Sequence, residues 1–594
     1  MAVTSPDDQV PTPRSKTCAS KQEDGESPCP GRKADGFEHC LAHLESAELD
    51  QVLQRLKPGA DLDASGTPID ADLLAQILRA VGDEDGRPVF GRVSFAGARF
   101  GGAAVFAGAQ FSDPAAFGGA KFSEVTVFGG AKFSEGARFA TAQFSEGVSF
   151  NKTQFSGTAD FADAQFSRIA DFADAQFSGL AVFRDAQFRG IAAFRGAQFR
   201  GTAAFRGAQF SGTANFRAAQ FGEDVGFYLA QFTGDAHFDR SRFQQNTSIG
   251  PLTARLLDLT EAVFDRHVVI EAAAAKIKCR GTTWNAGVTF RLRYAAIDLE
   301  RATFTQPSFV TGSDEWPWVS PVKGSQVHGH VLTRRADSQD TQAHSPDAWM
   351  PSLETLRGVD AANLSVTDVD LSCCSFAGAL LLDQLRLEGR CVFDNPPTGI
   401  RAGRAWPPVW RWSRRQNLWE ERNWRATTPK YLGWSDTRLK AAEVGPDRLA
   451  ALYRQLRKAQ EDAKNEPGAA DFYYGEMEMR RHARSTPWAE RFILAAYWAV
   501  SGYGLRATRA FAALAILIAG SAVVLQYAGF PGHTAAYLDS LLYAAGSVLS
   551  LSLVIGHLPV VLTHWGDVIR MLLRIAGPVL LGLAALALRG RVKR

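Results

Sequence analysis

Three cysteines and one histidine near the start of the chain have the residue types and spacing of a metal site. They follow the pattern C-x10-C-x10-C-x2-H and comprise Cys18, Cys29, Cys40 and His43. Three thiolates and one imidazole supply the four ligands of a tetrahedral structural Zn²⁺, and a closed set of this kind leaves no position for a substrate. A short segment with few apolar residues also needs a staple in order to fold. The spacing therefore predicts a structural zinc site; the alternative is unrelated cytoplasmic thiols with His43 on the following helix.

No other group of residues has the pattern of a catalytic site. The sequence shows no nucleophile beside a base, no phosphate-binding loop and no paired acids in a cleft. Glu476 and Glu478 are close in sequence, but Glu476 and Arg480 have the i,i+4 spacing of a surface ion pair on a helix. We therefore expect a protein that is not an enzyme.

The longest feature of the chain is a phenylalanine repeat. Through residues 95–243, twenty-eight phenylalanines recur at spacings that alternate between five and six residues, and a small residue, usually Ala, stands two positions before each. Such steps scatter side chains around a helix of 3.6 residues per turn, whereas in a four-walled β-coil both residues point inward. The repeat predicts a β-solenoid filled by Phe rings and Ala methyl groups; a disordered low-complexity tract is the weaker alternative.

The repeat resembles the pentapeptide-repeat family, whose five-residue unit has a central Leu or Phe and a small residue two positions before it. The resemblance, to membrane-anchored bacterial members in particular, implies a mainly β fold, a right-handed quadrilateral β-solenoid. Every second unit here has six residues, so each coil contains about 22 residues, and the extra residues are expected as bulges at regular corners. Looser steps continue to about residue 310, and a conventional copy returns within 353–395.

Arginine follows the Phe position in six units and makes a basic band. Its members are Arg184, Arg189, Arg195, Arg200, Arg206 and Arg217. The family resemblance also raises mimicry of duplex DNA as a further, less favoured alternative function. This activity requires a strongly acidic surface. Basic and acidic residues are nearly balanced in the repeat, and the whole chain carries a net charge of +3. We interpret the band as a docking surface for an acidic partner, with ordinary solvation as the alternative.

Apolar segments dominate the last hundred residues. Residues 510–530 contain only Gln526 as a strongly polar member and are long enough to cross a bilayer as a helix. A second such segment covers 569–588, and 538–560 between them is predicted as a partially inserted or third spanning segment. Basic residues at both outer ends predict that both ends lie in the cytoplasm, which requires two crossings; three crossings are the alternative. Residues 487–509 are predicted as an interfacial helix.

The order of helix, short inserted helix and helix is similar to the two-helix pore domain of tetrameric cation channels. Such channels coordinate ions with backbone carbonyls of a filter like Thr-Val-Gly-Tyr-Gly. Residues 552–557 read Ser-Leu-Val-Ile-Gly-His at the matching place, with a single glycine and no following Tyr-Gly. Potassium selectivity is therefore not expected, and a degenerate or gated channel-like protein is the alternative function.

Tryptophan and arginine are interleaved in the segment before the membrane helices, residues 396–445. These side chains suit the headgroup zone of an anionic leaflet or a cap with stacked arginines, and no nucleic-acid module accompanies them. Residues 446–485 have apolar positions on one face and are predicted as a helical hairpin, with residues 466–468 at the turn.

These observations predict a scaffold or adaptor in the cytoplasmic membrane, with several crossings, that displays its solenoid in the cytoplasm. Residues 1–16 contain no secretory signal, which is consistent with this placement. The expected partners are membrane lipid and an unidentified protein; nucleic acid is not expected, and a homo-oligomer is left open. The predicted divisions are a disordered tail (1–17), a Cys3His zinc knuckle (18–44), a short helical segment (45–90), the solenoid (91–310), an inserted surface loop (311–352), final coils (353–395), the Trp/Arg-rich segment (396–445), the hairpin (446–485), the interfacial helix (487–509) and the membrane domain (510–594).

Overall fold

The computed structural model of the chain folds as two compact units, which are described separately. Unit 1 comprises Met1–Cys374, Gly378–Leu380 and Glu388–Val392, and unit 2 comprises Ser375–Ala377, Leu381–Leu387 and Phe393–Arg594. The structure describes residues 17–21, 27–313, 349–397, 399–401, 409–411, 415–427, 434, 444–531, 536–548 and 561–592. The predicted tail before residue 17, the core of the predicted loop at 314–348 and the filter-like residues 552–557 lie outside the described residues.

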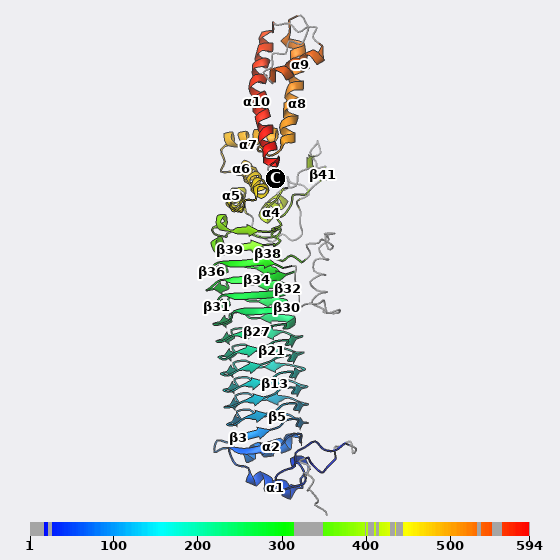
Figure 1. The fold of residues 1–594 in the computed structure, drawn as a ribbon, viewed down its shortest axis with the longest axis vertical. Helices are drawn as coiled ribbons and strands as arrows, with labels where there is room; N and C mark the ends of the chain where they lie inside the picture. Colours follow the sequence, from blue (N-terminus) through cyan, green and yellow to red (C-terminus); the bar gives the residue numbers. More distant parts are fainter. Residues whose placement is uncertain are drawn as a thin grey trace, which may run out of the picture. The chain divides into compact units, whose positions relative to one another are not determined.

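Unit 1 begins with short elements that lead into the solenoid (Figure 1). They are η1 (Leu41–His43), α1 (Ser46–Arg55), β1 (Ala60–Asp63), β2 (Pro68–Ile69) and α2 (Ala71–Ala80). Asp70 caps α2 by accepting a hydrogen bond from the backbone N–H of Leu73 at 2.8 Å, which satisfies one of the free donors of the first turn. β1 pairs in parallel with β3 (Val89–Ser94), so the first coil continues directly from these elements.

Four ladders of short parallel strands form the walls of the solenoid. The first wall contains β7 (Ala115–Ala116), β11 (Ala137–Arg138), β15 (Ala159–Asp160), β19 (Ala181–Val182), β23 (Ala203–Ala204) and β27 (Val225–Gly226). The second wall contains β4 (Arg99–Phe100), β8 (Lys121–Phe122), β12 (Gln143–Phe144), β16 (Gln165–Phe166), β20 (Gln187–Phe188) and β24 (Gln209–Phe210). The third wall contains β5 (Ala104–Val105), β9 (Thr126–Val127), β13 (Val148–Ser149), β17 (Ala170–Asp171), β21 (Ala192–Ala193) and β25 (Ala214–Asn215). The fourth wall contains β6 (Gln110–Phe111), β10 (Lys132–Phe133), β14 (Gln154–Phe155), β18 (Gln176–Phe177), β22 (Gln198–Phe199), β26 (Gln220–Phe221), β29 (Arg242–Phe243), β31 (Val263–Phe264), β33 (Thr283–Trp284) and β36 (Thr303–Phe304).

Later strands are longer and run across the corner between the second and third walls. They are β28 (Gln231–His237), β30 (Ser248–Asp258), β32 (Val268–Lys278), β34 (Val288–Arg293), β35 (Ala296–Asp298), β37 (Ser308–Gly312), β38 (Ser352–Thr355) and β39 (Leu364–Thr367). The short helix η2 (Ala361–Asn363) precedes β39, and η3 (Leu382–Gln384) and β40 (Arg386–Glu388) follow it. The coil length falls along the chain: Phe221 pairs with Phe243, Phe243 with Phe264, and Phe264 with Trp284. The period therefore changes from 22 residues to 21 and then to 20.

Stacked phenylalanine rings fill the solenoid, as the repeat predicts. Within one wall, Phe172 and Phe194 are nearly parallel, with centroids 4.8 Å apart and an interplanar angle of 3°. Between opposite walls, Phe172 meets Phe183 edge to face at 5.5 Å and 89°. Both geometries are favourable for aromatic quadrupoles and contribute about 0.5 to 1.5 kcal/mol per pair beyond area burial. The rings and the Ala methyl groups beside them are fully buried, so these side chains form the core.

The corners of each coil alternate between two geometries. After the first and third walls the chain turns through a residue with a positive φ, such as Gly207 (68°) or Ala218 (56°). After the second and fourth walls it passes through a wider bend that holds the sixth residue, while strand register stays unshifted, as for Phe166 and Phe188. At one such bend, a Cβ on Gly190 would lie 2.3 Å from a backbone oxygen of the preceding coil. The extra residues thus occupy regular corners, as expected, in bends that leave the strand register unchanged.

The described residues of unit 2 are mainly helical and also include the antiparallel pair β41 (Gly399–Arg401) and β42 (Val409–Arg411), besides η3 and part of β40. Its helices are α4 (Trp419–Thr427), α5 (Pro446–Asp462), α6 (Glu466–His482), α7 (Trp488–Ser501), α8 (Ala507–Val524) with a π-helical extension η4 (Leu525–Gly529), α9 (Tyr537–Val548) and α10 (His564–Val592). α5 and α6 form the predicted helical hairpin, with one difference in where the turn lies. Residues 466–468 form the first turn of α6 and not the connection, because proline is tolerated in the first turn of a helix.

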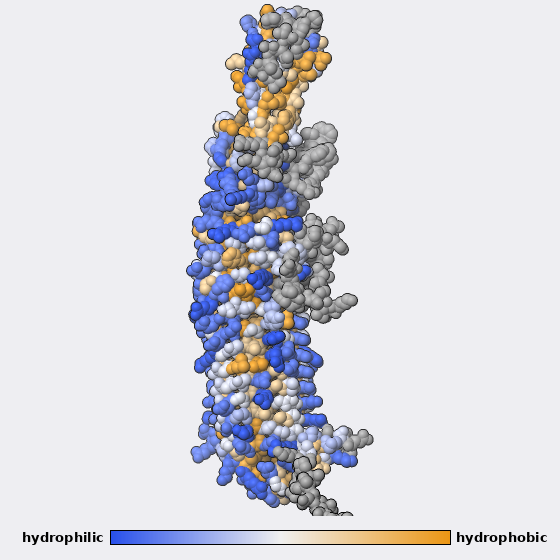
Figure 2. All heavy atoms as spheres, viewed as in Figure 1, coloured by the Kyte–Doolittle hydropathy of each residue, from blue (hydrophilic) through white to orange (hydrophobic). Residues whose placement is uncertain are grey.

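Two spans of unit 2 are long and apolar enough to cross a membrane by length and composition: Ala507–Gly529 and His564–Leu588. Hydrophobic atoms gather over α8 and α10 in the space-filling view (Figure 2). α9 has 12 residues and is too short to cross a bilayer, although residues 549–560 after it lie outside the described part of the chain. Leu525, Ala544, Val548 and Leu573 form a common core of α8, α9 and α10.

Candidate metal centre and interaction surfaces

The four predicted metal ligands lie together in unit 1. Cys18, Cys29 and Cys40 are buried, His43 is half-buried, and their ligand atoms all lie within 4.8 Å of one another. The Cys29 and Cys40 Sγ atoms are 3.9 Å apart, and the His43 Nδ1 atom is 3.3 Å from the Cys40 Sγ. A tetrahedral site with Zn–S bonds of about 2.3 Å places its sulfurs about 3.8 Å apart. The observed spacing therefore fits a Zn²⁺ ion, and these four residues could hold one.

Backbone N–H groups around the cluster favour thiolates. The N–H of Cys40 donates to the Cys18 Sγ at 3.3 Å, and that of Gly31 donates to the Cys29 Sγ at 3.4 Å. Burial alone raises the pKa of Cys18, but hydrogen bonds from the backbone of Cys40 and Ser20 outweigh it and bring the pKa to about 6. Burial raises the pKa of Cys40 to about 12, because it is the most enclosed of the three and faces the other two thiols. A bound dication would reverse this unfavourable charge balance.

The Cys3His cluster packs on the first coil of the solenoid. The Arg32 N–H donates to the Ser65 carbonyl oxygen at 2.8 Å, and the Arg32 guanidinium pairs with the Asp63 carboxylate at 2.8 Å. Gly66 has a φ of 67°, and a Cβ there would lie 2.3 Å from the Pro30 carbonyl oxygen. The loop between the second and third cysteines is therefore seated against the turn after β1. His39, the other nearby histidine, bonds to Ser20 and is not part of the ligand set.

The six arginines of the predicted band surround the solenoid and do not share one face. Arg184 and Arg206 follow paired positions of the first wall, and Arg195 and Arg217 follow paired positions of the third wall. The remaining two, Arg189 and Arg200, follow the second and fourth walls. All six side chains are exposed. This arrangement arises because residues 11 positions apart lie on opposite walls of the coil. Any flat docking surface therefore contains only one pair of these arginines.

An exposed apolar column runs along the corner before the third wall. Val125, Ile169 and Ile191 are 52%, 51% and 46% exposed, and they occupy the same position in successive coils, with Gly147 between the first two. Glu146 and Arg168 pair at 3.8 Å beside this column. The prediction from sequence considered only the Phe positions and missed it, although spacings of 22 and 44 residues between these side chains would have revealed it.

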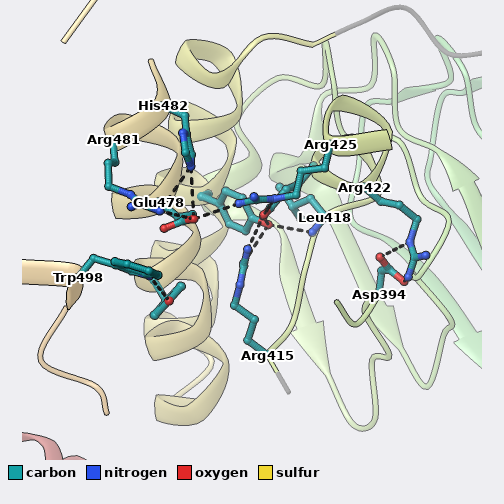
Figure 3. A network of polar contacts seen from close by, with 12 residues as sticks. Asp394, Arg415, Leu418, Arg422, Arg425, Glu478, Arg481, His482 and Trp498 are labelled. Atoms are coloured by element: carbon teal, nitrogen blue, oxygen red, sulfur yellow. Dashed lines mark hydrogen bonds and ion pairs between the residues drawn. The ribbon is translucent and has the colours of Figure 1, made fainter. Parts of the chain in front are cut away.

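A buried network of charges joins the helices of unit 2 (Figure 3). Glu421 on α4 accepts hydrogen bonds from Arg425 at 2.6 Å, from Arg415 and from the Tyr453 hydroxyl of α5. Burial raises the pKa of Glu421, but the neighbouring guanidinium groups of Arg415 and Arg425 outweigh this and hold it below its usual value. The carboxylate therefore stays ionised in the interior.

Glu478 on α6 is the second centre of this network. It accepts from Arg481 at 2.8 Å, from Arg425 at 3.3 Å and from the Tyr503 hydroxyl at 3.1 Å, and His482 lies 3.5 Å away. Burial opposes ionisation, but the hydrogen bond from His482 and the two guanidinium charges depress the pKa of Glu478 well below its usual range. The network thus connects α4, α5, α6 and the turn before α8.

The ion pair predicted between Glu476 and Arg480 is wrong. Glu476 is buried and pairs with two arginines of α5, Arg454 at 2.9 Å and Arg457 at 3.1 Å, whereas Arg480 pairs with Glu490 of α7. Spacing along one helix could not show that α5 and α7 would supply stronger partners.

In the predicted Trp/Arg-rich segment, the arginines whose side chains are described pack within unit 2. Arg425 lies over the Trp424 and Trp434 rings at 5.5 and 5.1 Å, and Arg415 lies over the Tyr474 ring at 5.3 Å. This agrees with stacked arginines and leaves these groups unavailable to lipid. Trp406, Trp412, Arg404 and Arg414 of the same segment lie outside the described residues.

Comparison with known families identifies the repeat. The model of pentapeptide repeats (9 copies) matches residues 106–154, 150–198 and 194–242. No curated protein and no solved structure matched the chain. Proteins with such repeats are generally structural or interaction proteins without catalytic activity. The chain therefore carries pentapeptide repeats folded as a β-solenoid of about 12 turns, with a C-terminal region of several helices.

Proposed function

We propose that the protein is a scaffold or adaptor without enzymatic activity, which holds its solenoid at the cytoplasmic face of a membrane for a protein partner. The observation that carries this proposal is the filled core: Phe rings and Ala methyl groups occupy the inside of the repeat coils, so binding must use the outer columns. Those columns present their outward side chains at a fixed spacing of about 4.8 Å, which suits an extended partner.

Membrane anchoring is supported by the two apolar spans of α8 and α10. Basic residues at the outer ends of these spans favour a cytoplasmic position for both, by the positive-inside rule. The Cys3His cluster supports a structural zinc that fixes the N-terminal end of unit 1 and takes no part in chemistry.

Variants of single walls test the docking function. The pair Arg184→Ser and Arg206→Ser removes the arginines of the first wall, and the pair Arg195→Ser and Arg217→Ser removes those of the third wall. A partner that docks on one wall is lost with one pair and retained with the other, so each variant is the control of its counterpart. The readout is the recovery of proteins cross-linked to the tagged full chain in membranes. Equal recovery from wild type and both variants would refute the arginine docking surface.

The succession of α8, the short α9 and α10 supports a second candidate, a channel-like membrane protein. This function requires several copies around a common axis. Native mass spectrometry of the full chain, gently extracted from membranes, gives the subunit number. Four copies would favour the channel-like candidate and justify measurements of ion flux, whereas one or two copies would leave the scaffold.

A further inference from the structure

α7 exposes an apolar stripe that none of the described residues covers. Trp488, Phe492 and Ile493 are 82%, 70% and 65% exposed. Trp488 and Phe492 are followed by the exposed Ala496 and Ala499, which completes an i, i+4, i+8, i+11 row on one side of the helix. Large apolar side chains gathered in this way mark a contact with another apolar phase or a partner.

The opposite side of α7 is the one that packs on the protein. Leu494 belongs to a cluster with Tyr474 and Met477 of α6 and with Tyr503. The Trp498 indole N–H also donates to the Tyr474 hydroxyl at 3.0 Å (Figure 3). α7 therefore has two apolar sides, and only one of them is used by the fold of unit 2.

The charges beside the exposed stripe are positive. Arg484 and Arg491 are exposed, and the only acidic residue of α7, Glu490, is already paired with Arg480. Basic residues next to an apolar stripe with a tryptophan are typical of helices that lie in a membrane interface. The combination favours an anionic surface with an apolar interior over a purely apolar protein partner.

The stripe also lies close in sequence to the apolar spans. α7 ends at Ser501 and α8 begins at Ala507, and α8 itself exposes Phe511 and Ile516 at 45% and 73%. If α8 enters a bilayer near Ala507, the short connection keeps α7 at the surface of the same bilayer, at the level of the headgroups.

We propose that α7 is a lipid-binding helix that lies in the plane of the membrane surface. Its stripe contacts acyl chains, and Arg484 and Arg491 bind the phosphates of anionic phospholipids. This inference deepens the proposed membrane anchoring and depends on it. It assigns to α7 a selectivity for anionic lipid.

Quenching by brominated lipid in nanodiscs tests this inference with the full chain. Nanodiscs contain either brominated phosphatidylglycerol or brominated phosphatidylcholine at equal mole fraction. The contribution of Trp488 is the difference in quenching between wild type and Trp488→Phe, a change at an exposed position that leaves the packed side of α7 intact. We expect Trp488 to be quenched, and about twofold or more by the anionic lipid, because each basic residue near the surface attracts anionic headgroups.

The double variant Arg484→Ser and Arg491→Ser should make the two lipids equal, whereas Arg448→Ser, a matched change of an exposed arginine on α5, should leave the preference intact. An equal effect of both lipids on wild type would overturn the anionic selectivity. Trp488 unquenched by either lipid would overturn the lipid contact, and two copies per nanodisc would then assign the stripe to a second copy of the chain. Failure of the anchoring itself is distinguishable, since the wild-type chain would then be released from membranes by alkaline carbonate.

Discussion

Some residues at the corners of the coils have a strained backbone conformation that lowers the stability of the protein by a measurable amount. Ala218 has a φ of 56°, a region that disfavours any side chain with a Cβ, and its side chain is exposed. We expect Ala218→Gly to raise the free energy of unfolding by about 0.5 kcal/mol, because relief of this strain exceeds the added freedom of the unfolded chain. Denaturant titration of the full chain in detergent measures the change.

The neighbouring residue provides the control for this prediction. Ala219 is fully buried beside the Phe column, and Ala219→Gly should lower the free energy of unfolding by about 1 kcal/mol. A loss of stability in both variants would contradict the assignment of strain to Ala218.

At the level of elements, the packing of the helices of unit 2 depends on buried charged side chains, and replacement of one of them should destabilise the unit. Glu478→Gln removes the carboxylate that pairs with the half-buried Arg481 and one of the two that pair with the buried Arg425, and removal of one partner from a buried pair typically costs about 3 to 5 kcal/mol. We expect the amides of α4 and α6 to exchange hydrogen faster in this variant. The control is Glu461→Gln, which changes an exposed carboxylate on α5.

The same carboxylates give unit 2 a dependence on pH. The pKa values of Glu421 and Glu478 are both depressed in the folded protein, so the unfolded chain binds more protons in the acid range. Their contribution to stability is therefore complete above the unfolded pKa of about 4.5 and is lost as the pH falls through the lower folded values. Wild type should lose protection of α6 on acidification, and Glu478→Gln should lose less. Equal acid sensitivity would contradict this role of Glu478.

Elements that repeat regularly along the chain could be predicted from the sequence, whereas contacts between unrelated segments could not. The Phe column and the four-walled coil follow from spacing alone, because each coil repeats the environment of the last. The Cys3His ligands were also predicted from spacing, and the structure places them together. The partners that Glu476 and Glu478 have on other segments were not predictable, since they come from α4, α5 and the turn before α8, and no period relates those segments.

At the scale of the whole of unit 1, stability should pass from coil to coil, because each coil contacts mainly its neighbours. Removal of metal by a chelator, or by Cys29→Ser, should increase hydrogen exchange around the cluster and in the first coil through the contacts of Arg32 and Gly66. The effect should decline with distance along the solenoid and be absent by Phe199. Cys373→Ser, which changes an exposed cysteine outside the cluster, is the control. A chelator without effect on the first coil would contradict a structural metal.

The half-coil period of 11 residues determines how the solenoid responds to insertions and deletions. Removal of 22 residues, such as 150–171, takes out one layer and rejoins every column with its own continuation. Removal of 11 residues preserves the alternation of corner types but exchanges opposite walls, so all columns beyond the join move to the far side. Two kinds of length change are therefore distinct. Insertion or removal of a whole coil changes only the length of the solenoid, whereas half a coil also reverses the direction in which the later side chains face.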